Sequence, residues 1–414
     1  MTDIVAPAAA GTTADELLQA LSGPESRADP YPLYRRLREI APLHRSGFDG
    51  LWYASRYEDC QQVLTNPRWG HQREGARFLG LSEEGAEQFN RSQRASLIGQ
   101  NPPEHTRLRS LVSRAFTRRR VQELEPRIVE LLEPMLEAMA EAGEVDVMAD
   151  LAFPLPVAVI GELVGVPAGE REAFRKLAAD STAAAEAYAS PEALKAAKRA
   201  NAFMEAYFVD LVARRRAEPA DDLLSGLIAA YDSGGRLSEE ELVAMAILLF
   251  LAGFATTSHL IGNGLLALLR HPAEFDRLWD DPSLVPSAVE EMLRWDPSLQ
   301  ATVRTAFEPM ELGGQIIEAG DTVVVLFGAA NRDPARFPDP ERFDVGRADN
   351  DHLSFAGGIH YCLGASLARV EGQIAFSRLI ARFRRIELAD EHPPWTASSK
   401  IRGLDALPVR LRPR

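Results

Sequence analysis

A cysteine stands inside a glycine-rich segment, FAGGIHYCLG, which spans residues 355–364. Its glycines would let the backbone approach another group closely. Residues 364–385 repeat apolar side chains at three- and four-residue spacing, which predicts a helix directly after the cysteine. The N-terminus of a helix stabilises a nearby thiolate, because its N–H groups and dipole favour negative charge. Cys362 is therefore a candidate metal ligand or nucleophile.

The neighbours of Cys362 bear on which chemistry it could serve. A nucleophilic cysteine needs a base, and His360 lies two residues away. A zinc site would need more cysteines and histidines than the nearby sequence offers. A single thiolate on a glycine loop fits the axial ligand of a haem iron. A small cysteine that only packs in a glycine turn is the structural alternative.

A second segment whose residues could take part in a reaction is AGFATT, residues 252–257, which lies within a long apolar pattern. A threonine inside a helix can donate to the carbonyl four residues back and bend or open the helix. Gly253 weakens the same turn. Such an opening beside a metal would leave room for dioxygen, whereas the alternative for Thr256 and Thr257 is ordinary packing.

Two pairs of ionisable residues have helical spacing. Glu291 and Arg294 are three residues apart and can pair on one helix face, although a surface pair would add little stability. His105 and Arg109, in the segment PPEHTRLR, are four apart and would also share a face. Taken alone, this spacing is also that of a solvated histidine at a helix end.

Composition excludes several classes of protein. The 414 residues include 46 Lys and Arg against 60 Asp and Glu, so the net charge of -14 argues against a nucleic-acid partner. Two cysteines cannot form a disulfide framework, and they suit a reducing cytoplasm. The N-terminus lacks the pattern of a signal peptide. The longest apolar run, residues 243–255, is shorter than the ~20 residues of a membrane span, so we expect no membrane association.

The periodicity predicts a mainly helical protein with a minor β portion. Helical patterns cover residues 110–142 and 364–385, and a helix of about 32 residues starts at Ser238, forms a capping box with Glu241 and ends at His271-Pro272. A hairpin is expected around residues 48–50 and two β-rich runs within 310–330. We also expect a last strand at 407–411, an ordered irregular loop at 336–350, and a flexible tail over residues 1–25 in which acids and helix formers favour a short helix after a ragged start.

The spacing F-x-x-G-x-H-x-C-x-G resembles the haem-binding signature of the cytochrome P450 family, matched at Phe355, Gly358, His360, Cys362 and Gly364. Other matches lie between residues 102 and 408, so the resemblance covers nearly the whole chain. It implies one domain over residues 1–414 with the cytochrome P450 fold. In that fold a long central helix and a proximal cysteine loop enclose haem b. The sequence has no C-x-x-C-H, so the haem would be bound without covalent attachment.

The resemblance also implies roles for individual residues. Cys362 would ligate the iron, and Thr256 would help to deliver protons to iron-bound oxygen. Ala255 departs from the family pattern, which has an acid there. The remaining haem contacts would be His105, Arg109, Ala252, Gly253, Arg304, Phe355, His360 and Gly364. Glu291, Arg294 and Arg342 would form a structural triad that holds the proximal loop.

The activity that the resemblance implies is insertion of one oxygen atom from O2 into a small organic molecule, expected to be a secondary-metabolite intermediate. Electrons would come from NAD(P)H through ferredoxin reductase and ferredoxin, because nothing in the chain resembles a flavin or nicotinamide domain. An arginine-rich segment could dock the ferredoxin; it contains Arg107, Arg109, Arg114, Arg118, Arg119 and Arg120. The alternatives are a peroxide-driven oxygenase and a non-catalytic relative that activates a partner enzyme. The sequence does not distinguish hydroxylation from epoxidation or oxidative coupling.

Overall fold

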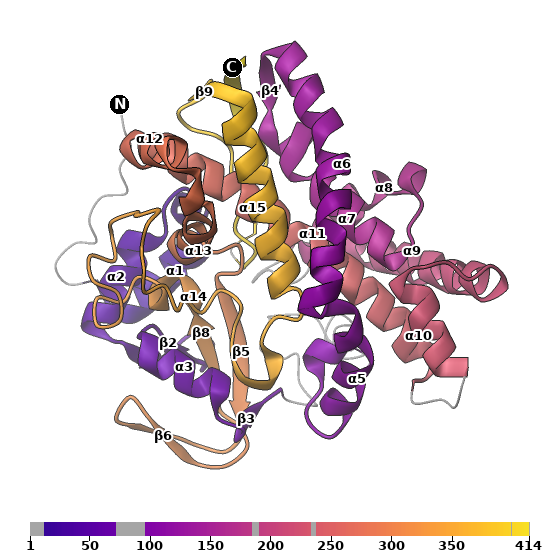
Figure 1. The fold of residues 1–414 in the computed structure, drawn as a ribbon. Helices are drawn as coiled ribbons and strands as arrows, with labels where there is room; N and C mark the ends of the chain where they lie inside the picture. Colours follow the sequence, from indigo (N-terminus) through magenta and orange to yellow (C-terminus); the bar gives the residue numbers. More distant parts are fainter. Residues whose placement is uncertain (1–11, 72–95, 184–189, 233–236, 399, 414) are drawn as a thin grey trace. The chain divides into compact units, whose positions relative to one another are not determined.

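The computed structural model describes residues 12–71, 96–183, 190–232, 237–398 and 400–413 (Figure 1). Its contacts divide the chain into two compact units, each built from separated stretches of sequence. The first unit comprises Met1–Gln72, His259–Cys362 and Ile386–Val409, and the second comprises Arg73–Ser258, Leu363–Arg385 and Arg410–Arg414. That the whole chain acts as one domain stays a prediction.

The first unit contains most of the β structure. Its strands are β1 (Leu43–Arg45), β2 (Trp52–Ala54), β3 (Trp69–Gly70), β5 (Ala301–Ala306), β6 (Met310–Leu312), β7 (Gln315–Ile317) and β8 (Thr322–Leu326). Its helices are α1 (Ala14–Ser22), α2 (Tyr31–Ile40), α3 (Tyr57–Thr65), α12 (Pro272–Asp280), α13 (Val285–Trp295) and α14 (Phe327–Ala330), with 3-10 turns η1 (Pro24–Arg27), η7 (Pro282–Leu284) and η8 (Gly358–His360).

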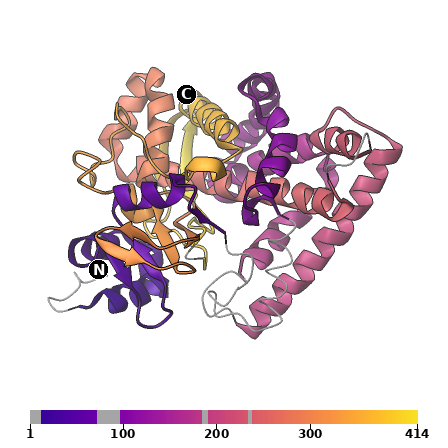
Figure 2. The ribbon, with the colours of Figure 1, turned by 90° about the horizontal axis from the view of Figure 1, so that it is seen from below.

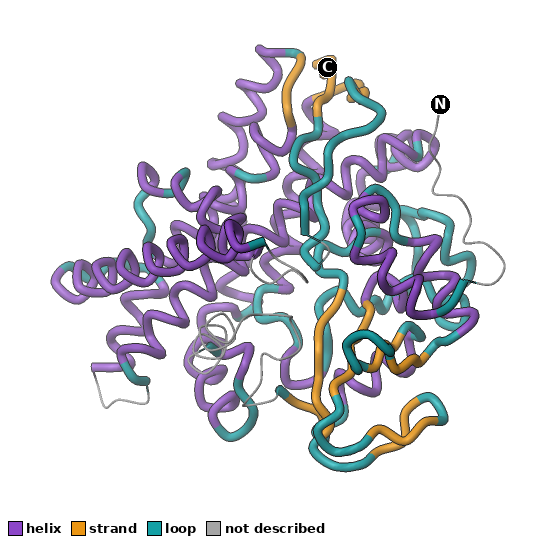
Figure 3. The backbone as a smooth tube through the Cα atoms, turned by 180° about the vertical axis from the view of Figure 1, so that it is seen from behind, coloured by secondary structure: helices purple, strands orange, loops and turns teal. Residues whose placement is uncertain are grey.

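Five strands of this unit form a mixed sheet in the order β1-β2-β8-β5-β3. β2 and β8 pair in parallel, with Trp52 opposite Val323, and the other neighbours are antiparallel. β6 and β7 make a separate hairpin, which Figure 3 shows beside the larger sheet. The predicted hairpin around residues 48–50 is confirmed as β1–β2. Its turn contains Gly50 at φ +75°, a conformation that favours glycine.

The expected tail is ordered in part. Residues 1–11 lie outside the described part of the chain, but α1 begins at Ala14. Thr13 caps this helix, and its backbone N–H donates to the Glu16 carboxylate at 2.7 Å. The short helix is therefore confirmed, and because Leu17 and Leu18 are buried, a flexible tail was wrong for the residues from Thr13 onward.

The second unit is helical, and Figure 2 shows its helices from below. They are α5 (Glu104–Val112), α6 (Arg118–Ala142), α7 (Pro154–Val164), α8 (Ala173–Ala183), α9 (Pro191–Ala217), α10 (Leu223–Asp232) and α15 (Ala365–Arg382), with η3 (Leu97–Gly99), η4 (Ser113–Phe116), η6 (Ala168–Glu170), the π-turn η5 (Met148–Ala152) and the strand β4 (Glu144–Asp146). α11 (Glu239–Arg270), β9 (Phe383–Leu388) and β10 (Pro408–Pro413) each continue from one unit into the other. α15 packs against α6, and Arg378 forms an ion pair with Glu133 at 3.3 Å.

The helix predicted from residue 110 to residue 142 is interrupted. α5 ends at Val112, a 3-10 turn follows, and α6 starts at Arg118. Thr117 has extended backbone angles, and its hydroxyl accepts from the Arg120 N–H at 3.4 Å as an N-cap. The apolar periodicity continues across this cap, which is why periodicity alone did not reveal the break.

α11 has the predicted start, end and length, 32 residues from Glu239 to Arg270. The capping box is confirmed: Ser238 N donates to the Glu241 carboxylate at 2.7 Å, and Glu241 N donates to Ser238 Oγ at 3.1 Å. Within the described residues, this helix is long and apolar enough to cross a membrane by length and composition alone. Half of its most apolar window is buried inside the protein, as in a core helix of a globular protein.

Candidate functional site

The loop that carries Cys362 is closed by backbone hydrogen bonds. Cys362 N donates to Phe355 O at 2.9 Å, and Tyr361 N donates to Gly358 O at 3.1 Å. Gly358 has φ +61°, and a side chain there would strike the backbone of Leu64 at the end of α3. The glycine is therefore required by both its backbone conformation and the close approach of α3.

The two cysteines have opposite environments. Cys60 is buried, and its thiol donates to Ala54 O at 3.2 Å. Burial raises the pKa of Cys60 far above its ordinary value, so this thiol stays protonated. Cys362 is exposed and stands directly before α15, whose N-cap is Gly364. Only Cys362 has a position that favours a thiolate.

The predicted haem residues are divided between the two units. The first unit contains Arg304, Phe355, His360 and Cys362, and the second contains His105, Arg109, Ala252, Gly253, Thr256 and Gly364. Within the first unit the Cys362 amide meets the Phe355 carbonyl, and the His360 ring lies edge-on to the ring of His71, with centroids 4.7 Å apart. Within the second unit, His105 is buried on α5.

Arg304 is a buried cation whose described partners are all neutral. Its Nη1 donates to Val303 O at 2.7 Å and to Thr302 Oγ1 at 3.3 Å. Among the residues that the structure describes, no carboxylate lies within ion-pair distance of it. Burial lowers the pKa of Arg304 to about 10. A guanidinium in this state would be stabilised by an anion from outside the chain.

The AGFATT segment forms a turn of α11 with extra side-chain hydrogen bonds. The hydroxyls of Thr256, Thr257 and Ser258 donate to the carbonyls four residues back, at 3.2, 3.3 and 2.8 Å. A side chain at Gly253 would strike Ile160 of α7, so α7 packs directly against this turn. Three successive carbonyls thus accept a second donor, an arrangement that bends helices. Ser258, which no sequence motif singled out, belongs to the same hydrogen-bonded turn as Thr256 and Thr257.

Arg107, between His105 and Arg109, does not belong to a solvated basic face. Its guanidinium pairs with the Glu241 carboxylate of the α11 capping box, with Nη1 3.3 Å from Oε2. Arg119 and Arg120 are exposed and pair with Glu123 on their own helix, at 3.1 and 3.3 Å. The side chains of Arg114 and Arg118 lie outside the described part. Of the described arginines in the expected patch, Arg107, Arg119 and Arg120 therefore pair with carboxylates, and of these three Arg119 and Arg120 are exposed.

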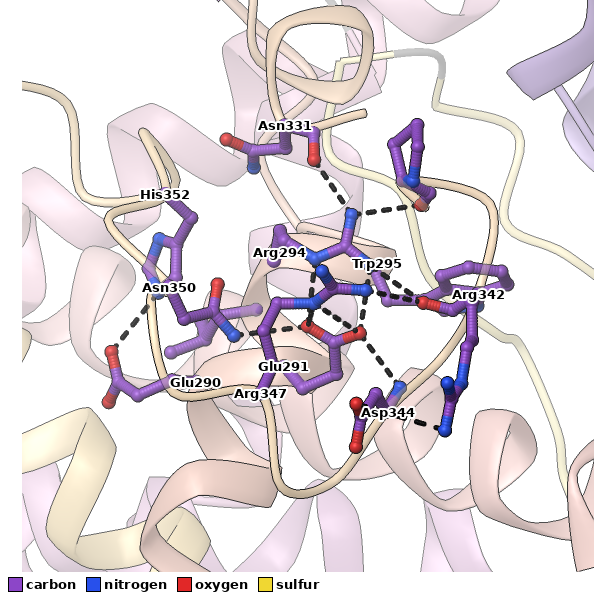
Figure 4. Close-up of polar contacts among 12 residues, drawn as sticks. Glu290, Glu291, Arg294, Trp295, Asn331, Arg342, Asp344, Arg347, Asn350 and His352 are labelled. Carbon is purple, nitrogen blue, oxygen red and sulfur yellow. Dashed lines mark hydrogen bonds and ion pairs between the residues drawn. The ribbon is translucent and has the colours of Figure 1, made fainter. Parts of the chain in front are cut away.

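Glu291 and Arg294 form the predicted pair, completely buried, with Nε–Oε2 2.7 Å and Nη2–Oε1 2.8 Å (Figure 4). The second guanidinium on Glu291 comes from Arg347, whose Nε lies 3.0 Å from Oε2. The side chain of Arg342, which we had placed in this triad, is mostly exposed, and only its backbone carbonyl accepts from Arg294, at 3.2 Å. The triad is therefore Glu291, Arg294 and Arg347.

Two further groups complete the Glu291 cluster. Asn350 Nδ2 donates to Oε2 at 3.0 Å, and Asp344 N donates to Oε1 at 2.9 Å. Both belong to the irregular loop predicted at residues 336–350. The P-E-R-F segment at residues 340–343, which resembles the family pattern, favoured Arg342, but Arg347, five residues further along the same loop, is the arginine whose side chain reaches Glu291. The cluster therefore ties the loop to α13.

Comparison with known proteins agrees with this geometry. A family model described as Cytochrome P450 matches residues 71–404. The chain is 42% identical over 414 residues to cytochrome P450 monooxygenase PikC of Streptomyces venezuelae, covering 97% of this chain and 96% of the relative. It is 40% identical over 399 residues to 6-deoxyerythronolide B hydroxylase of Saccharopolyspora erythraea, covering 92% and 96%. The solved structure of P450BioI with an acyl carrier protein carrying hexadec-9Z-enoic acid has 36% identity and a TM-score of 0.87, covering 95% and 100%.

The chain belongs to the cytochrome P450 family. It is a monooxygenase, an oxidoreductase that uses haem b, dioxygen and a redox partner to oxidise a small organic substrate. The residues present fit that cofactor. Cys362 offers an exposed thiol before a helix N-terminus, and Arg304 offers a buried cation that a haem propionate would neutralise.

Proposed function

We propose that this chain is a cytoplasmic, ferredoxin-dependent cytochrome P450 that oxidises a secondary-metabolite intermediate, with Cys362 as the ligand of the haem iron. The observation that carries the proposal is the closed loop that presents the exposed Cys362 directly before α15. The dipole and N–H groups of that helix favour the thiolate form. Bound haem supplies the activation of dioxygen, which the thiolate promotes.

The cationic residues serve to hold and orient the cofactor. Arg304 would pair with a haem propionate, which removes the energetic penalty of its burial. His105, Arg109 and His360 are proposed as the other propionate partners, by their match to the family motifs. Phe355 acts through the loop, because its carbonyl holds the Cys362 amide.

Proton delivery has to work without an acid at residue 255. Thr256 Oγ1 donates its hydrogen to Ala252 O at 3.2 Å, so its lone pairs can accept from a water or a substrate hydroxyl. Ala255 can neither hold nor transfer a proton. We propose that water at Thr256 or a hydroxyl of the substrate supplies the proton that an acid at residue 255 would otherwise have supplied.

Thr256→Ala should therefore raise the fraction of reducing equivalents lost as hydrogen peroxide, by about fivefold or more, corresponding to the loss of one hydrogen bond of about 1 kcal/mol. The measurement is product formed per NADPH consumed. Thr257→Ala, which removes the hydroxyl bonded to Gly253 O, is the matched control. If Thr256→Ala forms as much product per NADPH as wild type, Thr256 Oγ1 takes no part in proton delivery.

The substrate class is supported by what related proteins act on. One relative is named 6-deoxyerythronolide B hydroxylase, and another, 37% identical over 405 residues, is a polyketide biosynthesis cytochrome P450 of Bacillus subtilis. A structural neighbour with a TM-score of 0.85 was solved with myristic acid. We therefore propose an apolar natural-product intermediate as substrate, in place of a primary metabolite.

Ferredoxin is proposed as the electron donor because nothing in the chain resembles a flavin or nicotinamide domain, and Arg119 and Arg120 at the start of α6, exposed although paired with Glu123, are the described candidates for its docking. The test uses purified protein, ferredoxin, ferredoxin reductase, NADPH and ¹⁸O-labelled dioxygen, with polyketide lactones and fatty acids as substrates. We expect a product with one ¹⁸O atom. A parallel reaction with hydrogen peroxide alone should give little product. Efficient peroxide-driven turnover without ferredoxin would overturn this part of the proposal.

A further inference from the structure

The segment that leads into the Cys362 loop is attached to α13 through His352, which no sequence motif singled out. His352 is buried, and its Nε2 lies 3.2 Å from Oε2 of Glu290 (Figure 4). Its Nδ1 accepts from the Ser354 N–H at 3.2 Å. Because Nδ1 is an acceptor, the proton of the neutral ring is on Nε2, where it can be donated to the carboxylate.

The residues between His352 and Phe355 are fixed as well. Leu353 N donates to Asn331 Oδ1 at 2.8 Å, and Asn331 Nδ2 donates to Ser354 Oγ at 2.8 Å. Ser354 Oγ in turn donates to Leu293 O of α13 at 2.6 Å. The segment therefore has side-chain or backbone attachments at each successive residue.

This attached segment leads to a strained turn. Ala356 has φ +57°, a region that non-glycine residues enter only when their surroundings enforce it. Ala356 N donates to Leu353 O at 2.8 Å, which closes the turn. The ring of His352 lies against that of Phe355, with centroids 5.7 Å apart and planes at 48°. The carbonyl of Phe355 then accepts from Cys362 N at 2.9 Å.

We propose that His352, held by Glu290, is a positioning residue for the proposed iron ligand: it fixes Phe355 and thereby the carbonyl that holds the Cys362 amide. The inference rests on the proposed role of Cys362. His352 itself is ten residues from Cys362 in sequence and acts only through Phe355. Its loss would leave the strained Ala356 turn less constrained, and the cysteine loop would open more often.

The variants separate the two hydrogen bonds of the ring. His352→Leu removes both. His352→Asn keeps an oxygen that can accept from Ser354 N in an Asx turn, but it cannot stack on Phe355. Glu290→Gln keeps an acceptor for Nε2 and removes the charge. The exposed residues His392 and Glu391 provide matched controls, His392→Leu and Glu391→Gln.

The measurements are made on the holoenzyme. They are the rate at which the reduced carbonyl complex changes from the thiolate-type band to the thiol-type band, the reduction potential, and hydrogen exchange in peptides covering residues 352–362. We expect His352→Leu to speed the spectral change and the exchange about fivefold or more, because the loss of even one of its two hydrogen bonds, at about 1 kcal/mol, corresponds to that factor. His352→Asn and Glu290→Gln should be intermediate, and both controls should match wild type.

The inference is overturned if the His352 variants lose only thermal stability while the band conversion, potential and exchange stay at wild-type values. If His352→Leu does not fold, His352→Asn and Glu290→Gln decide the question by the same criteria. A wild-type protein without any thiolate-type band would instead refute the proposed role of Cys362. The two failures are therefore distinguishable.

Discussion

Two buried arginines of the first unit, Arg294 and Arg304, have opposite surroundings. Arg294 is completely buried, and its five N–H groups have the Glu291 carboxylate and the carbonyls of Asn331, Pro340 and Arg342 as partners. Arg304 is almost as buried, but its described partners are one hydroxyl and one carbonyl. Burial is expensive for a charge that lacks an opposite charge.

The difference separates a structural site from a binding site. The charge of Arg294 is compensated within the chain, so this residue holds the irregular loop on α13 whether or not a ligand is present. The charge of Arg304 is not compensated by any described residue, so its folded environment is complete only when an anion binds. A haem propionate is the anion that the family supplies.

The largest loss of stability should follow from removing the charge of Glu291, the partner of Arg294. Glu291→Gln leaves Arg294 and Arg347 buried without a carboxylate, so we expect the free energy of unfolding to fall by about 3–5 kcal/mol. Chemical denaturation of the holoenzyme measures this. Glu144→Gln, which affects the exposed Arg410–Glu144 pair, is the control and should change stability by less than about 1 kcal/mol.

The same measurement tests the corrected triad. Arg347→Ala should destabilise the protein by about 2 kcal/mol, because it removes a hydrogen-bonded, buried ion-pair partner. Arg342→Ala should have an effect below about 0.5 kcal/mol, since its side chain is mostly exposed. Equal losses in the two variants would contradict the difference that the structure shows.

Arg304→Leu should have opposite effects on the haem-free protein and on the protein with bound haem. The haem-free form should keep or gain stability, because an uncompensated buried cation is removed. The holo form should release haem about 10- to 100-fold faster, since a charged hydrogen bond of about 1.5–3 kcal/mol is lost. Haem transfer to an acceptor apoprotein gives the rate. An unchanged release rate would remove Arg304 from the haem site.

A buried carboxyl group provides the corresponding test of what it costs to bury an acid without an opposite charge. Glu371 of α15 is buried, and burial alone raises its pKa to about 8. The unfolded chain ionises near pH 4.5, so the stability contributed by the protonated form is present below that pH and is lost as the pH rises through 8.

Glu371→Gln lacks this dependence. We therefore expect its stability relative to wild type to increase by about 1–3 kcal/mol between pH 5 and pH 8. Unfolding free energies of both proteins at three pH values in this range measure the difference. A difference that does not change with pH would mean that Glu371 is ionised in the folded protein.

The sequence predicted those features that local spacing determines. The α11 capping box, the 48–50 hairpin and the Glu291–Arg294 pair each depend on residues within a few positions of one another, and each was confirmed. Arg347 was missed because an arginine 56 residues from its partner has no spacing to identify it. The break before α6 was missed because a threonine cap leaves the apolar periodicity intact, and His352 because its partners come from α13 and a backbone amide.

The central claim is that Cys362 ligates the haem iron as a thiolate, and one spectrum tests it most directly. The reduced carbonyl complex of the wild-type protein should show the strongly red-shifted Soret band of thiolate ligation. Cys362→Ala should lose that band completely, while Cys60→Ala, which alters the buried cysteine, should keep it. A wild-type band that persists in Cys362→Ala, or that disappears in Cys60→Ala alone, would contradict the assignment.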